Sequence, residues 1–310
     1  MRNTVINGLV GIARQDSNVA LIVGDLGYGV VDEFARLFPE RFIDAGISEQ
    51  AMTSLAAGLA LEGFEPYIYS IGNFPTLRCL EQIRNDVCER GLRVRIIAVG
   101  SGFPYGQLGM SHHATEELAA LRALPGMRIF TPTGPRDAKL ALDAAHACDG
   151  PCYLRLAKGG EKDLYPEGAE LDVYHAFELV PRGEVNILAS GAVASEAVGA
   201  AELLSKWGID AGVYLFAAVK PLDSSTVKEL ASVSKLLVTV EEHNVIGGFG
   251  GAVAEAVSEM PGSGARAPLL RLGLQDIFSP GVGDAAWLRA KCGIDAEGIA
   301  AAVEKRLGEL

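Results

Sequence analysis

Apolar runs alternate with amphipathic or small-residue segments along the first half of the chain. Uninterrupted apolar runs predict strands at 19–25, 65–70, 93–100, 127–132 and 152–156. Helices are expected between them, at about 31–38, 51–60, 76–88, 116–123 and 135–147. Strands that alternate with helices are typical of a parallel, doubly wound α/β domain.

The alternation weakens between 157 and 184, where polar residues accompany Pro166 and Gly168 and predict a linker. A second α/β pattern then begins, with strands expected at 185–191, 210–215 and 236–243 and helices at 194–207 and 252–259. We therefore predict two doubly wound α/β domains, one over residues 1–172 and the other over residues 180–310.

The segment 42–50 joins an apolar, strand-like run to the helix that follows it. The run breaks at Gly46 and then presents the carboxylate of Glu49. Ligands of open α/β sheets bind at such strand-to-helix junctions. A carboxyl enclosed there by apolar neighbours holds its proton more tightly and can exchange it with a ligand nitrogen. The segment alone favours the alternative, a carboxylate stabilised by the helix dipole.

Composition and charge narrow the possible functions of the 310 residues. The chain is 49% hydrophobic and 21% charged, and its formal net charge is −12. This charge argues against nucleic-acid binding through general electrostatics, and a phosphorylated substrate would need a local basic pocket. No apolar run of membrane-spanning length and no signal-peptide core are present, so we expect a cytoplasmic protein with no membrane partner. The five cysteines do not form a zinc pattern.

A glycine-rich loop follows the strand expected at 93–100 and leads to Ser111, His112 and His113. Glycines let a backbone approach a ligand closely, and the histidines are candidate proton or hydrogen-bond donors. Capping of the next helix is the alternative for Ser111 and His112. His113 is the weaker candidate, because adjacent loop residues usually point apart.

Other candidates leave their alternatives open. Arg155, near a strand end, could meet an anionic substrate or be a surface arginine. Phe74 could be a platform for a flat ring or part of the core. The run 247–251 lacks the glycine spacing of a dinucleotide loop, so it predicts tight packing of a helix on a strand and makes a nucleotide-dependent oxidoreductase a distant alternative.

Taken together, these motifs resemble the thiamine-diphosphate enzymes of the transketolase and deoxyxylulose-phosphate synthase group. The resemblance covers nearly the whole chain, in order. It is carried by 44–50 with the small-residue helix after it, 78–84, 106–113, 124–127 with 131–132, 219–223, 241–243 and 247–248.

The resemblance implies a role for each candidate. Glu49 would supply the acid that hydrogen-bonds the cofactor's aminopyrimidine and activates it. Phe74 would stack on the pyrimidine, although its spacing to Arg78 is one residue off the synthase pattern. The implied cofactor-binding residues are Glu49, Phe74, Arg78, Gly46 and Ile47. His112 would face the substrate as a catalytic residue, with Ser111, His113 and Arg155 as further substrate-binding residues; Arg155 would hold a substrate phosphate.

A missing motif adds an expectation about partners. Family members with a complete site carry a Gly-Asp-Gly motif and a later Asn that bind Mg²⁺ or Ca²⁺, which holds the diphosphate. No Gly-Asp-Gly occurs in this sequence. We therefore expect no metal ligand in this chain, a separate subunit that binds the metal and diphosphate, and an α2β2 heterotetramer that transfers a two-carbon ketol or acyl unit.

The sequence departs from the family pattern at two positions, and two alternative functions remain open. Leu108 stands where sugar transketolases have a substrate-binding aspartate, and Gly100 stands where they have a second histidine, so the usual sugar-phosphate donor is in doubt. The beta subunit of a 2-oxo acid dehydrogenase is the nearest alternative for the function. A non-catalytic scaffold or regulatory subunit is the alternative of another class, because fold alone does not guarantee chemistry.

Overall fold

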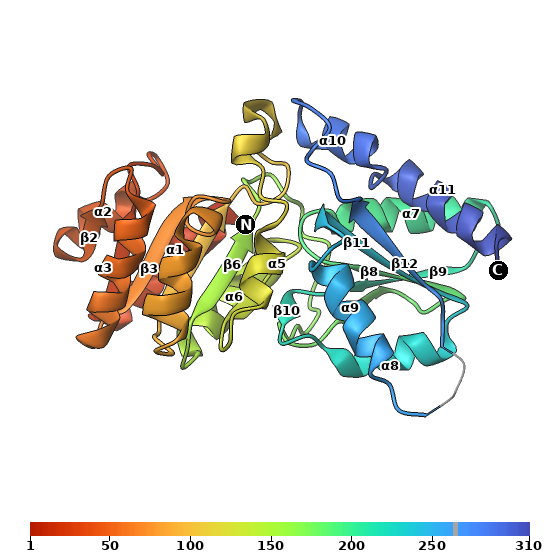
Figure 1. The fold of residues 1–310 in the computed structure, drawn as a ribbon, viewed down its shortest axis with the longest axis horizontal. Helices are drawn as coiled ribbons and strands as arrows, with labels where there is room; N and C mark the ends of the chain where they lie inside the picture. The colour runs from red at the N-terminus through yellow and green to blue at the C-terminus, as the bar shows by residue number, and fades with distance from the viewer. Residues whose placement is uncertain (263–265) are drawn as a thin grey trace.

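The computed structural model describes residues 1–262 and 266–310. It contains two α/β units that lie side by side, the first running from red to green and the second from green to blue in Figure 1. Each unit has a largely parallel sheet covered by helices, as the alternating pattern predicts. The expected fold class is therefore confirmed.

The first sheet has seven strands in the order β10-β5-β6-β4-β3-β1-β2. Its strands are β1 (Val19–Val23), β2 (Phe42–Asp44), β3 (Glu65–Ile71), β4 (Arg95–Val99), β5 (Arg128–Phe130), β6 (Cys152–Leu156) and β10 (Ala218–Lys220). The first six pair in parallel. Their carboxyl ends therefore meet at one edge, where Glu49, Phe74 and His112 follow β2, β3 and β4.

Helices cover both faces of this sheet. They are α1 (Arg2–Gln15), α2 (Asp32–Leu37), α3 (Glu49–Leu61), α4 (Leu80–Gln82), α5 (Glu117–Arg122) and α6 (Pro135–Ala147). Short helical turns add η1 (Pro39–Arg41), η2 (Leu77–Cys79), η3 (Ile83–Cys88), η4 (Gly106–Leu108) and η5 (Met110–His112). The segment 76–88, expected as one helix, is divided into η2, α4 and the π-helical η3.

The second sheet has five strands in the order β12-β11-β8-β9-β7. The strands are β7 (Phe177–Val180), β8 (Val185–Ala189), β9 (Ala211–Leu215), β11 (Leu236–Asn244) and β12 (Leu269–Leu274). The helices are α7 (Ala194–Lys206), α8 (Ser224–Val233), α9 (Phe249–Ser258), α10 (Ala285–Cys292) and α11 (Ala296–Gly308). Only β7 runs antiparallel to its neighbour among these strands.

The two units are tightly joined. Strand β10 follows β9 in the chain but pairs antiparallel with β5, so it completes the first sheet. One apolar core includes Ile129 and Tyr153 of the first unit together with Phe216 and Phe249 of the second. Each fully buried large apolar side chain contributes about 1.5–3 kcal/mol. The predicted domain boundary between 172 and 180 therefore remains a prediction, and the two units share one sheet and one core.

The glycine run 247–251 begins α9, as the packing interpretation predicts. A side chain on Gly248 would collide with Glu241 of β11, and one on Gly250 would collide with Thr239 of the same strand. Across the described residues, no helix combines the length and apolar character needed to cross a membrane.

Candidate active site

Glu49 begins α3 and lies at the carboxyl edge of the first sheet. Its side chain is only 3% exposed although the preceding Ile47 is 77% exposed. Gly46 makes the turn possible with a φ of +67°, which favours glycine. The Glu49 carboxylate thus enters the protein while the loop before it stays at the surface.

Arg78 holds one oxygen of this carboxylate. Its Nη1 donates to Oε2 of Glu49 at 2.8 Å, and its guanidinium also lies over the Phe74 ring, 4.3 Å from the centroid. The other oxygen, Oε1, faces Gly24 at the end of β1, where an added Cβ would lie 3.9 Å away. In the part of the chain that the structure describes, Oε1 has no hydrogen-bond partner. One carboxyl oxygen is therefore fixed and the other is free for a ligand.

His112 joins this group from the loop after β4. Its ring meets the edge of the Phe74 ring at a centroid distance of 5.2 Å, and its Nδ1 lies 3.1 Å from the Ser111 hydroxyl. Asn73 ties the two loops together, because its amide donates to the carbonyl of Ser111 at 3.0 Å. The structure thus brings Glu49, Arg78, Phe74, His112 and Ser111 into one cluster, called the Glu49 group below.

His113 points the opposite way. It is 2% exposed, and its ring lies between the carbonyl of Gly106, 3.2 Å from Nε2, and the hydroxyl of Ser279 in the second unit. Burial lowers the pKa of the imidazole. His113 therefore anchors the loop rather than lining the Glu49 group, which does not favour its expected substrate contact.

Arg155 does not lie with the Glu49 group either. It is 6% exposed, its Nε donates to Glu117 at 2.5 Å, and its Nη2 donates to the carbonyls of Ala114 and Glu242 at 2.8 and 2.9 Å. The buried carboxylate of Glu117 helps to raise the pKa of this guanidinium. A side chain bonded in this way joins the two units. Because its donors are used within the chain, its position does not favour the expected contact with a substrate phosphate.

Glu242 of the second unit packs against the glycine-rich loop and holds it in place. Glu242 is 3% exposed on its side chain and accepts from the backbone N–H of Phe103 at 3.3 Å. A Cβ on Gly102 would collide with it, so only glycine lets the loop approach this closely. Arg289 of α10 pairs with Glu242 and, at 3.0 Å, with Glu196. The position of the His112 loop therefore depends on the C-terminal half of the chain.

A cavity of about 500 Å³ opens next to the loop after β6. Its lining includes Pro104, Lys158, Lys162, Ser195 and Arg289. Lys158 is exposed and its ammonium lies 4.8 Å from the centroid of the Tyr105 ring. The sequence placed this loop in the linker, so the lysine was missed; its position just beyond a buried strand at the ligand-binding edge was the available signal.

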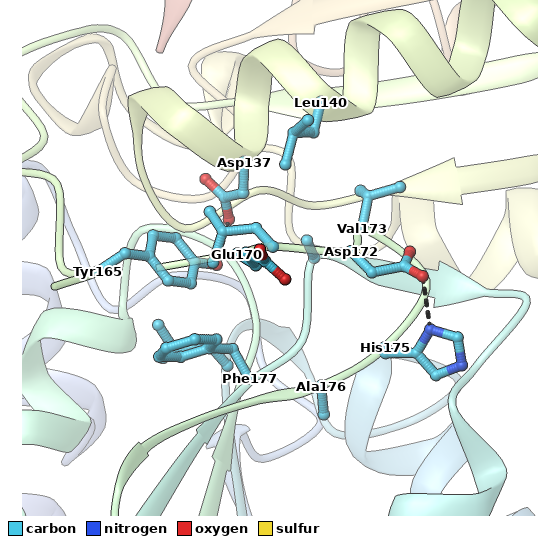
Figure 2. A pocket seen from close by; sticks show the side chains of 12 residues that line it. Asp137, Leu140, Tyr165, Glu170, Asp172, Val173, His175, Ala176 and Phe177 are labelled. Carbon is cyan, nitrogen blue, oxygen red and sulfur yellow. Dashed lines mark hydrogen bonds and ion pairs between the residues drawn. The ribbon is translucent and has the colours of Figure 1, made fainter. Parts of the chain in front are cut away.

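A smaller cavity of about 170 Å³ lies under the linker (Figure 2). Its acids are bonded within the chain: Tyr165 donates to Asp137 at 2.9 Å, and Asp172 lies 2.8 Å from His175, as the dashed line in Figure 2 marks. Burial raises the pKa of Asp137, but its carboxylate also accepts from the backbone of Thr133 and Gly134. These bonds hold the linker in place, so we assign the acids a structural role.

Family comparisons identify the fold. The model of the transketolase pyrimidine binding domain matches residues 1–160, and that of the transketolase C-terminal domain matches residues 175–299. The chain belongs to the transketolase family. Its Glu49 group and the loop that carries His112 both lie in the pyrimidine-binding part. The family uses thiamine diphosphate and a divalent metal ion.

Three known proteins resemble the chain over its length. A putative transketolase C-terminal section of Methanocaldococcus jannaschii is 35% identical over 97% of this chain and 94% of its own length. A 6-deoxy-6-sulfo-D-fructose transketolase subunit of Clostridium sp. (strain MSTE9) is 33% identical over 98% and 94%. A solved structure described as a split gene transketolase, inactive beta4 tetramer, has a TM-score of 0.87 at 33% identity over 99% and 97%. These relatives favour a transketolase subunit over the beta subunit of a 2-oxo acid dehydrogenase and over a scaffold.

Proposed function

We propose that this chain is the pyrimidine-binding subunit of a two-subunit transketolase that transfers a two-carbon ketol unit to an aldehyde. The observation that carries the proposal is the Glu49 carboxyl. It is almost fully buried at the ligand-binding edge of the sheet, with Oε2 bonded to Arg78 and Oε1 free. A buried acid with one free oxygen suits a ring nitrogen as partner.

The residues at this edge fit the aminopyrimidine half of thiamine diphosphate. Oε1 of Glu49 would hold a proton toward the ring nitrogen, and Phe74 would offer a flat apolar surface. Thiamine diphosphate, when bound, supplies the carbanion chemistry of ketol transfer. Donation from Oε1 requires a protonated carboxyl, so we expect the Arg78 side chain, which is 45% exposed, to turn away when the site fills.

His112 would act on the substrate rather than on the cofactor. Its ring is fixed from two sides, by the Ser111 hydroxyl on Nδ1 and by the edge of Phe74. Nε2 would then exchange a proton or hydrogen bond with a substrate oxygen. Packing against Phe74 keeps this ring beside the proposed pyrimidine platform.

Lys158 replaces Arg155 in this proposal as the group that binds an anionic substrate end. It is exposed beside the 500 Å³ cavity, whereas Arg155 is buried and ion-paired. The relative from Clostridium is named for a sulfonated sugar, and relatives from other bacteria are named for apulose 4-phosphate, so both substrate names include an anionic group. An anionic ketose or aldose is the substrate class that suits this lysine.

Exposed apolar side chains occur on the loops and the helix at the carboxyl edge of the first sheet and support a partner subunit there. They belong to four loops and one helix: Tyr28, Ile47, Leu55, Leu77, Leu108 and Met110. Clustered exposed apolar groups mark protein contact sites. The family's metal and diphosphate would be bound by the partner, and two of the relatives that match over nearly their whole length are named as a section and a subunit. We propose an α2β2 assembly with a chain that carries the Gly-Asp-Gly motif.

The test uses Glu49→Gln in the chain reconstituted with that partner. We expect kcat for ketol transfer from hydroxypyruvate to fall by about 10²–10⁴-fold, the usual contribution of a positioned acid or base. Glu62→Gln is the matched control, because Glu62 is exposed at the other end of α3. Its expected rate is within about twofold of the parent. Equal rates for Glu49→Gln and the parent complex would contradict the proposal.

A further inference from the structure

The Tyr105 ring occupies the space that a side chain of residue 100 would fill. Gly100 follows β4 with a φ of +78°. A Cβ added there would lie 3.3 Å from Cγ of Tyr105 and would overlap its Cδ2 and Cε2 atoms. The ring therefore rests directly on the Gly100 backbone, in the middle of the sheet edge.

The neighbours of Gly100 place this ring between the loops that carry Phe74 and His112 and the loop that carries Lys158. On one side is Gly72, two residues before Phe74; a Cβ there would lie 3.8 Å from the carbonyl oxygen of Gly100 and 3.7 Å from that of His112. On the other side, the N–H of Gly100 donates to Leu156 at 2.8 Å, two residues before Lys158.

Lys158 completes the arrangement, because its ammonium lies over the Tyr105 ring and beside the cavity that Pro104 also lines. The interaction of an exposed cation with the face of an aromatic ring contributes about 0.5–1 kcal/mol. The ring thus positions the proposed anion-binding group as well as filling space.

We propose that Tyr105 is a specificity-determining residue that limits the length of the substrate carbon chain between His112 and Lys158. The inference rests on the proposed function. A substrate that reacts beside His112 and binds Lys158 through its anionic end must pass over this ring. The ring is bulky and half-buried, so it takes up room along this path and favours a short carbon chain. Removing it opens room for a longer chain and releases Lys158.

The first experiment measures acceptor preference in the reconstituted complex, with hydroxypyruvate as donor. The donor's carboxylate leaves as CO₂, its remaining two-carbon unit forms a bond to the aldehyde carbon, and the aldehyde oxygen takes up a proton. The acceptors are glyceraldehyde 3-phosphate, with three carbons, and ribose 5-phosphate, with five. We expect Tyr105→Ala to raise the five-carbon to three-carbon ratio of kcat/KM by about tenfold or more, the usual effect of pocket size on selectivity.

Tyr105→Phe is the matched control, because it keeps the ring and should leave the ratio within about twofold. Tyr105→Leu, which shortens the side chain while keeping it apolar, serves if the alanine variant does not fold. An unchanged ratio in a variant that still turns over would overturn the inference and leave the proposed function standing. A parent complex that transfers no ketol unit to either acceptor would overturn both.

A second experiment needs no activity. Gly100→Ala is expected to lower the thermal midpoint of the full chain, through its positive φ and its collision with the ring. In a Tyr105→Ala background the same change should cost clearly less, because only the backbone strain remains. An equal loss in both backgrounds would contradict the placement of the ring over Gly100.

Discussion

Two buried carboxylates, Glu49 in the first unit and Glu241 in the second, occupy similar positions but have different hydrogen-bond partners. Each is about 2% exposed and lies at the carboxyl edge of a parallel sheet, beside the start of a helix. Glu241 accepts from the N–H groups of Phe249 and Gly250 at 2.6 and 2.8 Å, so both its oxygens are bonded within the chain. Glu49 has one oxygen paired with a half-exposed arginine and the other free.

The difference shows that burial alone does not mark a reactive acid. The glycines at the start of α9 let its N–H groups reach Glu241, which closes that edge and makes the carboxylate a structural part of the second unit. At the first edge, Glu49 is itself in the first turn of α3, so its carboxyl extends away from the helix toward Gly24. A carboxyl oxygen that its own chain leaves without a partner is available to a ligand.

The largest expected effect compares the two arginine–carboxylate pairs. Arg155→Ala would leave the fully buried Glu117 without its cation, and we expect the free energy of unfolding to fall by about 3–5 kcal/mol. Arg78→Ala breaks a pair of similar length whose arginine is 45% exposed, and should cost less, about 1–3 kcal/mol for the buried Glu49 oxygen left without its donor. Urea unfolding of the isolated chain measures both. Similar losses would show that the two edges are equally closed.

The second prediction concerns pH. Burial raises the pKa of Glu241 to about 7 in the folded chain, against an ordinary value of 4.5. The folded state then binds more protons than the unfolded state between these values, so this group's contribution to stability is present below pH 4.5 and is lost as pH rises through 7. Relative to Glu241→Gln, the parent chain should lose about 3 kcal/mol between pH 4.5 and 8. A difference in unfolding free energy that stays constant across this range would contradict the prediction.

The smallest expected effect concerns Lys158, which is exposed beside a cavity. Lys158→Ala should raise the KM of the complex for glyceraldehyde 3-phosphate by about tenfold, which corresponds to one charge-assisted hydrogen bond of about 1.4 kcal/mol. The thermal midpoint should fall by no more than a few degrees, because the lysine is exposed and its contact with Tyr105 contributes about 0.5–1 kcal/mol. Lys206→Ala, at the exposed end of α7, is the control. If KM rose equally for glycolaldehyde, which has no phosphate, Lys158 would not be the anion-binding group.

Most of the strands that build the two sheets could be predicted, because buried parallel strands are short continuous apolar runs. Helix α1 was not expected, although its buried positions Val5, Ile6, Leu9 and Val10 follow helical spacing. Strands β7, β10 and β12 were also missed. β10 has three residues, and its pairing with β5 depends on a partner about 90 positions away in the chain, which no local pattern can show.

Within the site, local motifs predicted the cluster but not the direction of each side chain. Ser111, His112 and His113 are consecutive, yet His112 meets Phe74 while His113 meets Ser279, 166 residues later. Arg155 and Lys158 are three residues apart, and only the fold shows that the first is buried against Glu117 and the second is open to a cavity. The assignment of Arg155 to substrate followed its place near a strand end and the family resemblance, neither of which shows the direction of the side chain.

The sequence by itself determined the α/β architecture, the family and the group of residues around Glu49, since these depend on apolar periodicity and on motifs a few residues long. Tertiary structure alone decided which polar groups the chain bonds internally and which it leaves open. Arg155 and His113 are bonded by residues far away in the chain, and Glu241 is bonded by the first N–H groups of the helix that follows its strand. Within residues 1–262 and 266–310, Oε1 of Glu49, His112 and Lys158 have no such partners. The reason is that a hydrogen bond is satisfied by a neighbour in space, and such neighbours are set by the packing of the two sheets against each other.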